Sequence, residues 1–168
     1  MLPAVSGRGF RCRLWRDATL PSSYDFSIIV PVVGKTVARR SVRFFLVEIF
    51  REFTFEAAHR LPNVAPGHKC GRLHGHSYRF AVHLEGPVGQ ETGWVRDFAD
   101  LACAVEPLLT RLDHYYLNEV EGLENPTSEV LAQWIWDRLR PALPEMSKVV
   151  VRETCTSGCV YQGEHYGG

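Results

Sequence analysis

The strongest constraint on the fold is a run of alternating side chains from His74 to Glu85. Every second position holds an aromatic, apolar or histidine residue, and the positions between them are mostly small or polar. The first set is His74, His76, Tyr78, Phe80, Val82 and Leu84. A period of two predicts a β-strand with one buried face. Two histidines therefore lead the inward face of this strand, and glycine and proline at 86 and 87 end it.

Three further strands are predicted from similar patterns. Between residues 47 and 59, the positions of one parity are largely apolar, so a strand there would present them on one face. They are Val47, Ile49, Phe53, Phe55, Ala57 and His59. The valine-rich segment 146–153 and the short segment 159–163 after Gly158 are also typical of strands.

Two amphipathic helices are predicted between the second and third strands. Asp97 is a typical N-cap residue, and apolar residues recur behind it at helical spacing as far as Leu112. Pro107 is expected to bend this helix. An Asn-Pro-Thr cluster at 125–127 predicts the start of the second helix, which Pro141 ends. The order strand, strand, helix, helix, strand, strand indicates an α+β domain.

The charge balance divides the chain near residue 45. Residues 1–45 hold eight lysines and arginines against two acids, and residues 46–168 hold eleven against seventeen. We expect residues 1–45 to be a basic N-terminal extension, either disordered, or an organelle-type presequence, or sequence upstream of the true start. Residues 46–168 are expected to form the folded domain. The total of nineteen bases and nineteen acids offers no basic field for nucleic acid as the main partner.

Cysteine content and hydropathy indicate the compartment. Five cysteines are an odd number, which favours a reducing compartment over a disulfide framework. The longest apolar run covers only residues 28–33, far short of the roughly 20 residues that span a bilayer. We therefore expect a cytoplasmic protein with no membrane partner.

Three histidines form the sharpest chemical pattern. His74 and His76 are two residues apart on one strand, so their imidazoles point the same way, and His59 ends another strand. Three histidines with an open fourth position are typical of a catalytic Zn²⁺ site. The alternative is that each is an ordinary half-buried or surface histidine.

Cys70 lies four residues before His74, and Lys69 and Arg72 flank it with positive charge. Cysteine serves equally well as a zinc ligand and as a nucleophile or base. Cys70 is therefore either the fourth ligand of a closed structural site or a reactive thiolate beside an open metal site. The spacing alone leaves both interpretations open.

Two acidic positions could support chemistry. Asp113 precedes His114, and an aspartate that orients an imidazole supports a general base or proton shuttle. The alternative is an ordinary helix end with a histidine that suits the helix dipole. Glu153 shares the parity of the buried valines, so an amidine-like heterocycle edge would be a fitting partner. Its alternative is a salt bridge to Arg152 or to another basic residue.

Five ordered motifs resemble those of the 6-pyruvoyltetrahydropterin synthase family. They are FTFEAAHRLP at 53–62, GHKCGRLHGH at 67–76, LDHYYLN at 112–118, LENPTSE at 123–129 and ETCTSGC at 153–159. More narrowly, they are similar to the bacterial, carboxy-forming branch of the family, which serves queuosine biosynthesis. The resemblance covers residues from about 47 to 164 and leaves the first 45 residues uncovered.

The resemblance implies a T-fold subunit, which is a four-stranded antiparallel sheet with two helices inserted between strands two and three. It also implies a homo-oligomeric ring with active sites at subunit interfaces. By motif position, the implied Zn²⁺ ligands are His59, His74 and His76. The other implied site residues are Cys70 as the catalytic thiol, Asp113 and His114 as its proton-transfer partners, and Glu153 as the anchor of the pterin ring.

The implied activity is that of a zinc-dependent carbon–carbon lyase. It takes 7,8-dihydroneopterin triphosphate to 6-carboxy-5,6,7,8-tetrahydropterin and releases acetaldehyde and triphosphate, as a step towards a 7-deazaguanine nucleoside of tRNA. The spacing of three residues between Cys70 and His74 is that of the carboxy-forming branch, whereas pyruvoyl-forming relatives typically have a longer spacing. Two alternatives are an enzyme of the same fold that stops at the pyruvoyl product, and a non-catalytic zinc module with Cys70 as the fourth ligand.

Overall fold

The computed structural model describes residues 27–29, 39–41 and 46–163. The chain divides into two units, Met1–Phe44 and Phe45–Gly168. In the first unit, β1 (Ser27–Ile29) pairs antiparallel with β2 (Arg39–Ser41). The rest of the expected N-terminal extension, Cys12 included, lies outside the described residues, so what we expect of residues 1–45 stays a prediction.

The second unit is built around two long antiparallel strands, β3 (Leu46–His59) and β4 (His74–Pro87). The predicted alternation is confirmed in both strands, because Phe55, Tyr78 and Phe80 are at most 2% exposed while their sequence neighbours Thr54 and Arg79 are exposed. The register ends with His59 opposite His74. The last residue of one strand therefore meets the first residue of the next.

The sheet contains one strand more than the sequence predicts. β6 (Met146–Arg152) pairs antiparallel with β4, and β7 (Cys159–Tyr161) pairs antiparallel with β6. The additional strand, β5 (Tyr115–Tyr116), runs parallel to β3 at Ala57 and Ala58, so the order is β5-β3-β4-β6-β7. The α+β class is confirmed, but the four-stranded, wholly antiparallel sheet is corrected to a mixed sheet of five strands. Two residues are too few for an alternation to reveal β5.

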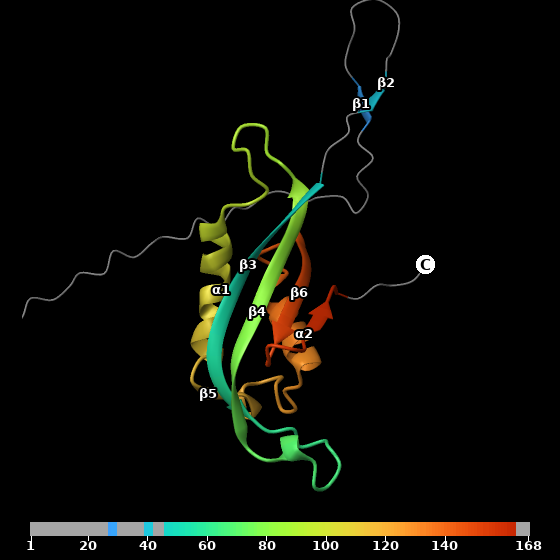
Figure 1. Cartoon of the computed structure of the whole chain (residues 1–168). Helices are drawn as coiled ribbons and strands as arrows, with labels where there is room; N and C mark the ends of the chain where they lie inside the picture. The colour runs from blue at the N-terminus through green and yellow to red at the C-terminus, as the bar shows by residue number, and fades with distance from the viewer. Residues whose placement is uncertain (1–26, 30–38, 42–45, 164–168) are drawn as a thin grey trace, which may run out of the picture. The chain divides into compact units, whose positions relative to one another are not determined.

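Helices α1 (Phe98–Leu112) and α2 (Ser128–Leu139) lie between β4 and β6 in the chain and cover the same face of the sheet (Figure 1). Both begin as predicted, because Asp97 accepts from the Ala99 N–H and the Thr127 hydroxyl accepts from the Val130 N–H. The core lies between helices and sheet. Its fully buried members include Leu101, Val105, Leu112, Leu131, Ile135, Val82 and Val149.

Two short 3₁₀ turns complete the second unit. Lys69–Gly71 forms η1, just before β4, and Leu117–Glu119 forms η2, just after β5. Within the described part of the chain, neither helix has the length and apolar character needed to cross a membrane.

Candidate metal centre and active site

The paired ends of β3 and β4 bring three histidines together. Antiparallel pairing places His59 opposite His74 and Ala57 opposite His76. The ring centroid of His59 lies 4.5 Å from that of His74 and 5.1 Å from that of His76. The centroids of His74 and His76 are 4.9 Å apart. One nitrogen from each ring lies within 4.8 Å of the other two, so this group could hold a metal ion. Cysteine and carboxylate side chains of the described residues could also have joined such a group, but it consists of the three histidines alone and does not include Cys70.

Hydrogen bonds fix the orientation of two of these rings. The Nδ1 atom of His59 lies 3.0 Å from the Pro126 carbonyl oxygen, and the Nδ1 atom of His74 lies 2.8 Å from the Arg72 carbonyl oxygen. A carbonyl oxygen only accepts, so each Nδ1 must carry the proton and donate it. In the neutral rings, the lone pairs are then on Nε2.

The two Nε2 atoms of His59 and His74 face each other at 3.1 Å. Two lone pairs at that separation repel unless a proton or a cation lies between them. A tetrahedral zinc ion with Zn–N distances of about 2.0–2.1 Å would hold two ligand nitrogens about 3.3 Å apart. The donor set and its spacing therefore fit a zinc ion.

The environment of His59 favours the neutral ring that a metal needs. Its side chain is 1% exposed. Burial lowers the pKa of His59, the Pro126 carbonyl opposes this, and the neighbouring His74 and His76 lower it further. The charge of Glu153 acts in the opposite direction and raises the pKa of His59. At neutral pH, His59 is therefore unprotonated and competent to bind a cation.

Asp113 and His114 form a hydrogen-bonded pair at the end of α1. The Asp113 Oδ2 atom lies 3.0 Å from His114 Nδ1, and Oδ1 accepts from the Glu56 backbone N–H at 2.9 Å. His114 has a φ of 61°, which is in the left-handed region. This backbone conformation lets two adjacent side chains converge, where neighbours in a regular strand would point apart. The His114 N–H completes the anchorage by donating to the Glu56 carbonyl at 2.6 Å.

The Glu56 N–H and then His114 hold the pKa of Asp113 below its ordinary value. Asp113 is therefore a carboxylate at neutral pH and accepts the proton on His114 Nδ1. This leaves His114 Nε2 as the nitrogen that can take up or release a proton. The His114 side chain is 77% exposed, so that nitrogen is accessible to a ligand.

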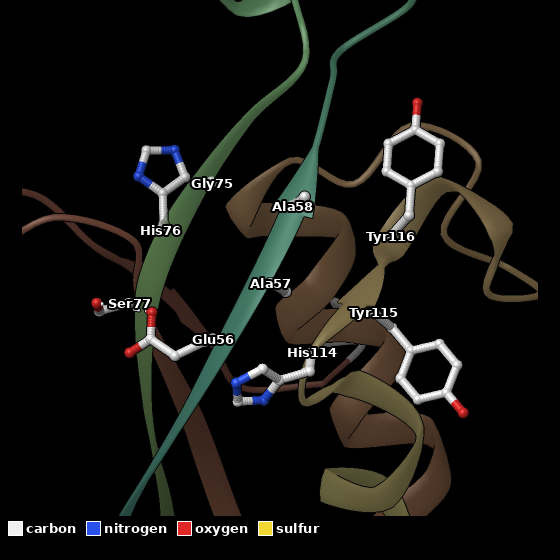
Figure 2. Close-up of a pocket in the computed structure, with 9 residues that line it drawn as sticks. All are labelled: Glu56, Ala57, Ala58, Gly75, His76, Ser77, His114, Tyr115 and Tyr116. Carbon is white, nitrogen blue, oxygen red and sulfur yellow. Dashed lines mark hydrogen bonds between the residues drawn. The ribbon is translucent and has the colours of Figure 1, made fainter.

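An open pocket of about 480 Å³ is lined by one member of the histidine group, His76, and by one member of the Asp113–His114 pair, His114 (Figure 2). His76 and His114 both line it, together with Glu56, whose carboxylate accepts from the Ser77 hydroxyl at 2.9 Å. Tyr115 and Tyr116 complete one wall. Two imidazoles and a carboxylate on one pocket are suited to proton transfer.

Cys70 is held on the η1 turn before β4. Its backbone N–H donates to His68 Nδ1 at 3.2 Å, and its carbonyl accepts from the Leu61 N–H at 2.8 Å. The thiol is free and half-buried. Cys70 does not line the pocket that contains His76 and His114, and Glu153 does not either.

Glu153 directly follows β6, which ends at Arg152, one residue earlier than predicted. Glu153 is half-buried, and its charge acts on both His59 and Tyr78. Arg152, the partner considered for it, instead lies 3.6 Å from Glu52. The charge of Glu153 therefore acts on one residue of the histidine group, His59, and on Tyr78.

The structure adds two residues that the sequence reasoning did not single out. Asn118 accepts from the Arg60 N–H at 3.0 Å and donates to the carbonyls of Arg60 and Glu124 at 2.9 and 3.0 Å. Glu56 positions the Asp113–His114 pair through its backbone. Both residues occur within the quoted motifs, but no periodicity distinguishes them from their neighbours.

Comparison with known proteins agrees with this geometry. Residues 48–164 match the family described as 6-pyruvoyl tetrahydropterin synthase. The chain is 49% identical over 119 residues to the 6-carboxy-5,6,7,8-tetrahydropterin synthase of Synechocystis sp., covering 67% of this chain and 91% of that protein. It is 33% identical over 138 residues to the human 6-pyruvoyl tetrahydrobiopterin synthase, covering 70% of this chain and 92% of that protein.

A solved structure has the same fold. The 6-pyruvoyl tetrahydropterin synthase of Caenorhabditis elegans superposes with a TM-score of 0.68 at 29% identity, covering 73% of this chain and 99% of that one. The predicted T-fold is thereby confirmed.

Proposed function

The chain belongs to the 6-pyruvoyl tetrahydropterin synthase family, and from this premise we propose that it is a zinc-dependent carbon–carbon lyase of the carboxy-forming branch. It converts 7,8-dihydroneopterin triphosphate and water into 6-carboxy-5,6,7,8-tetrahydropterin, acetaldehyde and triphosphate, as a step of queuosine biosynthesis. The observation that carries this choice of reaction is the 49% identity to the Synechocystis protein over 91% of its length.

His59, His74 and His76 are the zinc ligands in this proposal. The two Nε2 lone pairs that converge at 3.1 Å support a cation at this position, and the absence of cysteine from the described metal-ligand group supports an open, catalytic site. When bound, a zinc ion supplies Lewis acidity towards the hydroxyl and carbonyl oxygens of the substrate side chain.

Cys70, Asp113 and His114 move protons between the pterin ring and its side chain. His114 exchanges a proton at Nε2, while the Asp113 carboxylate holds the ring through Nδ1. Cys70 acts as the catalytic thiol. These transfers allow triphosphate to leave and the side-chain carbon–carbon bond to break, and the new carboxylate takes its second oxygen from water. Glu153 anchors the heterocycle, because a carboxylate accepts two N–H donors side by side.

The protein is a cytoplasmic homo-oligomer with active sites at subunit interfaces. Two observations support assembly. Cys70 and Glu153 do not line the pocket that holds His76 and His114, so a second subunit can complete the site. Within the described residues, the outer edge of β3 has a strand partner only at Ala57 and Ala58, and a long open edge favours pairing with another chain.

Residues 1–45 take no part in this chemistry, since the family match begins at residue 48. A chain that starts at residue 46 is expected to retain the activity and the metal of the full chain.

The test is to incubate zinc-loaded protein with 7,8-dihydroneopterin triphosphate and to quantify pterin products by mass spectrometry and acetaldehyde by a coupled assay. Carboxy-tetrahydropterin with an equal amount of acetaldehyde is the expected result. Cys70→Ala should keep stoichiometric zinc and lose turnover, whereas Cys103→Ala on α1 is the matched control that keeps both. Loss of zinc from Cys70→Ala would favour the non-catalytic module with cysteine as a fourth ligand.

A second candidate function is synthesis of 6-pyruvoyl tetrahydropterin from the same substrate. The identity of 33% to the human 6-pyruvoyl tetrahydrobiopterin synthase favours it. A pyruvoyl product without acetaldehyde in the same assay would establish this activity in place of the first.

A further inference from the structure

Tyr78 carries a buried hydroxyl without a hydrogen-bond partner among the described residues. The side chain is 1% exposed on the inward face of β4. Buried hydroxyls almost always find a partner, because leaving one unsatisfied is costly. A polar group in this position requires an explanation when phenylalanine would fill the same space.

Aromatic rings hold the Tyr78 ring in place. The Phe55 ring stacks on it with centroids 4.9 Å apart and an interplanar angle of 6°. The rings of His59 and His76 meet it edge-on at 5.8 and 5.5 Å. A ring clamped in this way cannot swing its hydroxyl out to solvent. The partner of the hydroxyl must therefore come to it.

The sheet register identifies that partner. Phe80 pairs with Val151 and Arg79 pairs with Arg152, so the next position along β4 is Tyr78, and the residue that directly follows β6 is Glu153. Glu153 is half-buried, and continuing the β6 register by one residue would place it on the face of Val151, opposite Tyr78. Side chains directly opposite on adjacent strands have Cβ atoms about 4.5–5.5 Å apart.

A phenol is an O–H donor at neutral pH, and a carboxylate is a hydrogen-bond acceptor. Tyr78 and Glu153 are therefore complementary as donor and acceptor.

Glu153 begins the loop that joins β6 to β7. Residues 154–158 are exposed, and the Thr154–Ser157 hydroxyl contact of 2.7 Å lies within the loop. The far end is fixed at Gly158, where a Cβ atom would come within 2.9 Å of the Val151 carbonyl oxygen. Glu153 can therefore approach Tyr78 by a local change at the end of β6.

We infer that Tyr78 is a positioning residue for Glu153, whose carboxylate accepts a hydrogen bond from the Tyr78 hydroxyl when a pterin is bound. Each carboxylate oxygen has two lone pairs, so Glu153 can accept from Tyr78 and from the N–H groups of the heterocycle together. The inference rests on the proposed function, in which Glu153 is the pterin anchor. It gives the tyrosine a role in orientation rather than in proton transfer.

The experiment compares Tyr78→Phe with the wild-type protein. Binding of 7,8-dihydroneopterin, which lacks the triphosphate, is followed by fluorescence titration alongside zinc content and thermal unfolding. The dissociation constant should rise about tenfold, the usual scale for one lost hydrogen bond to a charged group. Zinc content should be unchanged, and Tm without ligand should be equal or higher because no satisfied bond is lost. With the full substrate, KM should rise and kcat should change little.

A double-mutant cycle separates positioning from packing. In a Glu153→Ala background, Tyr78→Phe should cause no further loss of binding. Tyr161→Phe, whose ring packs on Trp136, is the matched control and should bind as the wild type does. An unchanged dissociation constant for Tyr78→Phe, an equal loss in both backgrounds, or loss of zinc would each overturn the inference. No pterin binding by the wild type would instead overturn the proposed function and remove the basis of the inference.

Discussion

Asn118 offers the most informative test of how the site is held, because its side chain joins two segments that flank His59. It bonds to both backbone groups of Arg60, the residue after His59, and to the carbonyl of Glu124. Glu124 lies two residues before Pro126, whose carbonyl receives the His59 Nδ1–H. Asn118→Ala removes all three bonds and should loosen both supports of His59.

The magnitude follows from those three bonds. Each contributes about 0.5–1.5 kcal/mol net, and the groups are partly exposed, so Asn118→Ala should lower the free energy of unfolding by about 2–3 kcal/mol. Loss of a group bonded directly to a metal ligand typically weakens metal binding about 10–100-fold, and Asn118→Ala, which acts on His59 through Arg60 and the segment of Glu124, should weaken it by the lower end of that range. Asn118→Asp should be at least as damaging, because a carboxylate would face the carbonyls of Arg60 and Glu124.

Urea unfolding would measure stability, and competition with a chromophoric chelator would measure zinc affinity. Gln133→Ala is the matched control, since it removes an exposed amide from α2 and should change neither quantity. If Asn118→Ala stays within about 0.5 kcal/mol of the wild type and keeps its zinc affinity, the reasoning about the supports of His59 is wrong.

Three further predictions concern the metal, the sheet and the pterin. His74→Ala should lose both bound metal and turnover, measured by mass spectrometry of the metal and by the product assay; an active variant without metal would refute the zinc assignment. Glu48→Gln should cost less than about 1 kcal/mol at pH 7, because the Glu48 carboxylate contacts Lys148 at 2.8 Å at a partly exposed position. Lys148 holds the pKa of Glu48 below its ordinary 4.5, so this contribution is complete above pH 4.5 and fades as the pH falls through the lowered value. A difference between variant and wild type in urea unfolding that persists at pH 2 would contradict that pairing. Glu153→Gln should weaken 7,8-dihydroneopterin binding and leave zinc in place, and unchanged affinity would exclude Glu153 as the anchor.

The sequence by itself determined the main strands, both helices and the shared face of His74 and His76. These features depend on periods of two and about 3.6 residues along the chain. Such periods can be read from the sequence without knowing which segments pack against each other. The caps at Asp97 and Thr127 are equally local, since each bonds within its own helix. The resemblance of the motifs added the zinc ligands and the reaction that we propose.

Only the tertiary structure decided how the site residues meet. The strand β5 is too short to show a pattern, and the left-handed backbone that turns His114 onto Asp113 follows from bonds to Glu56, more than fifty residues earlier. The ring of His59 is oriented by the Pro126 carbonyl, 67 residues away. The same holds for the convergence of the two Nε2 atoms of His59 and His74, which depends on strand register. A one-dimensional pattern records which face a side chain occupies, whereas contacts between distant segments exist only once the chain has packed.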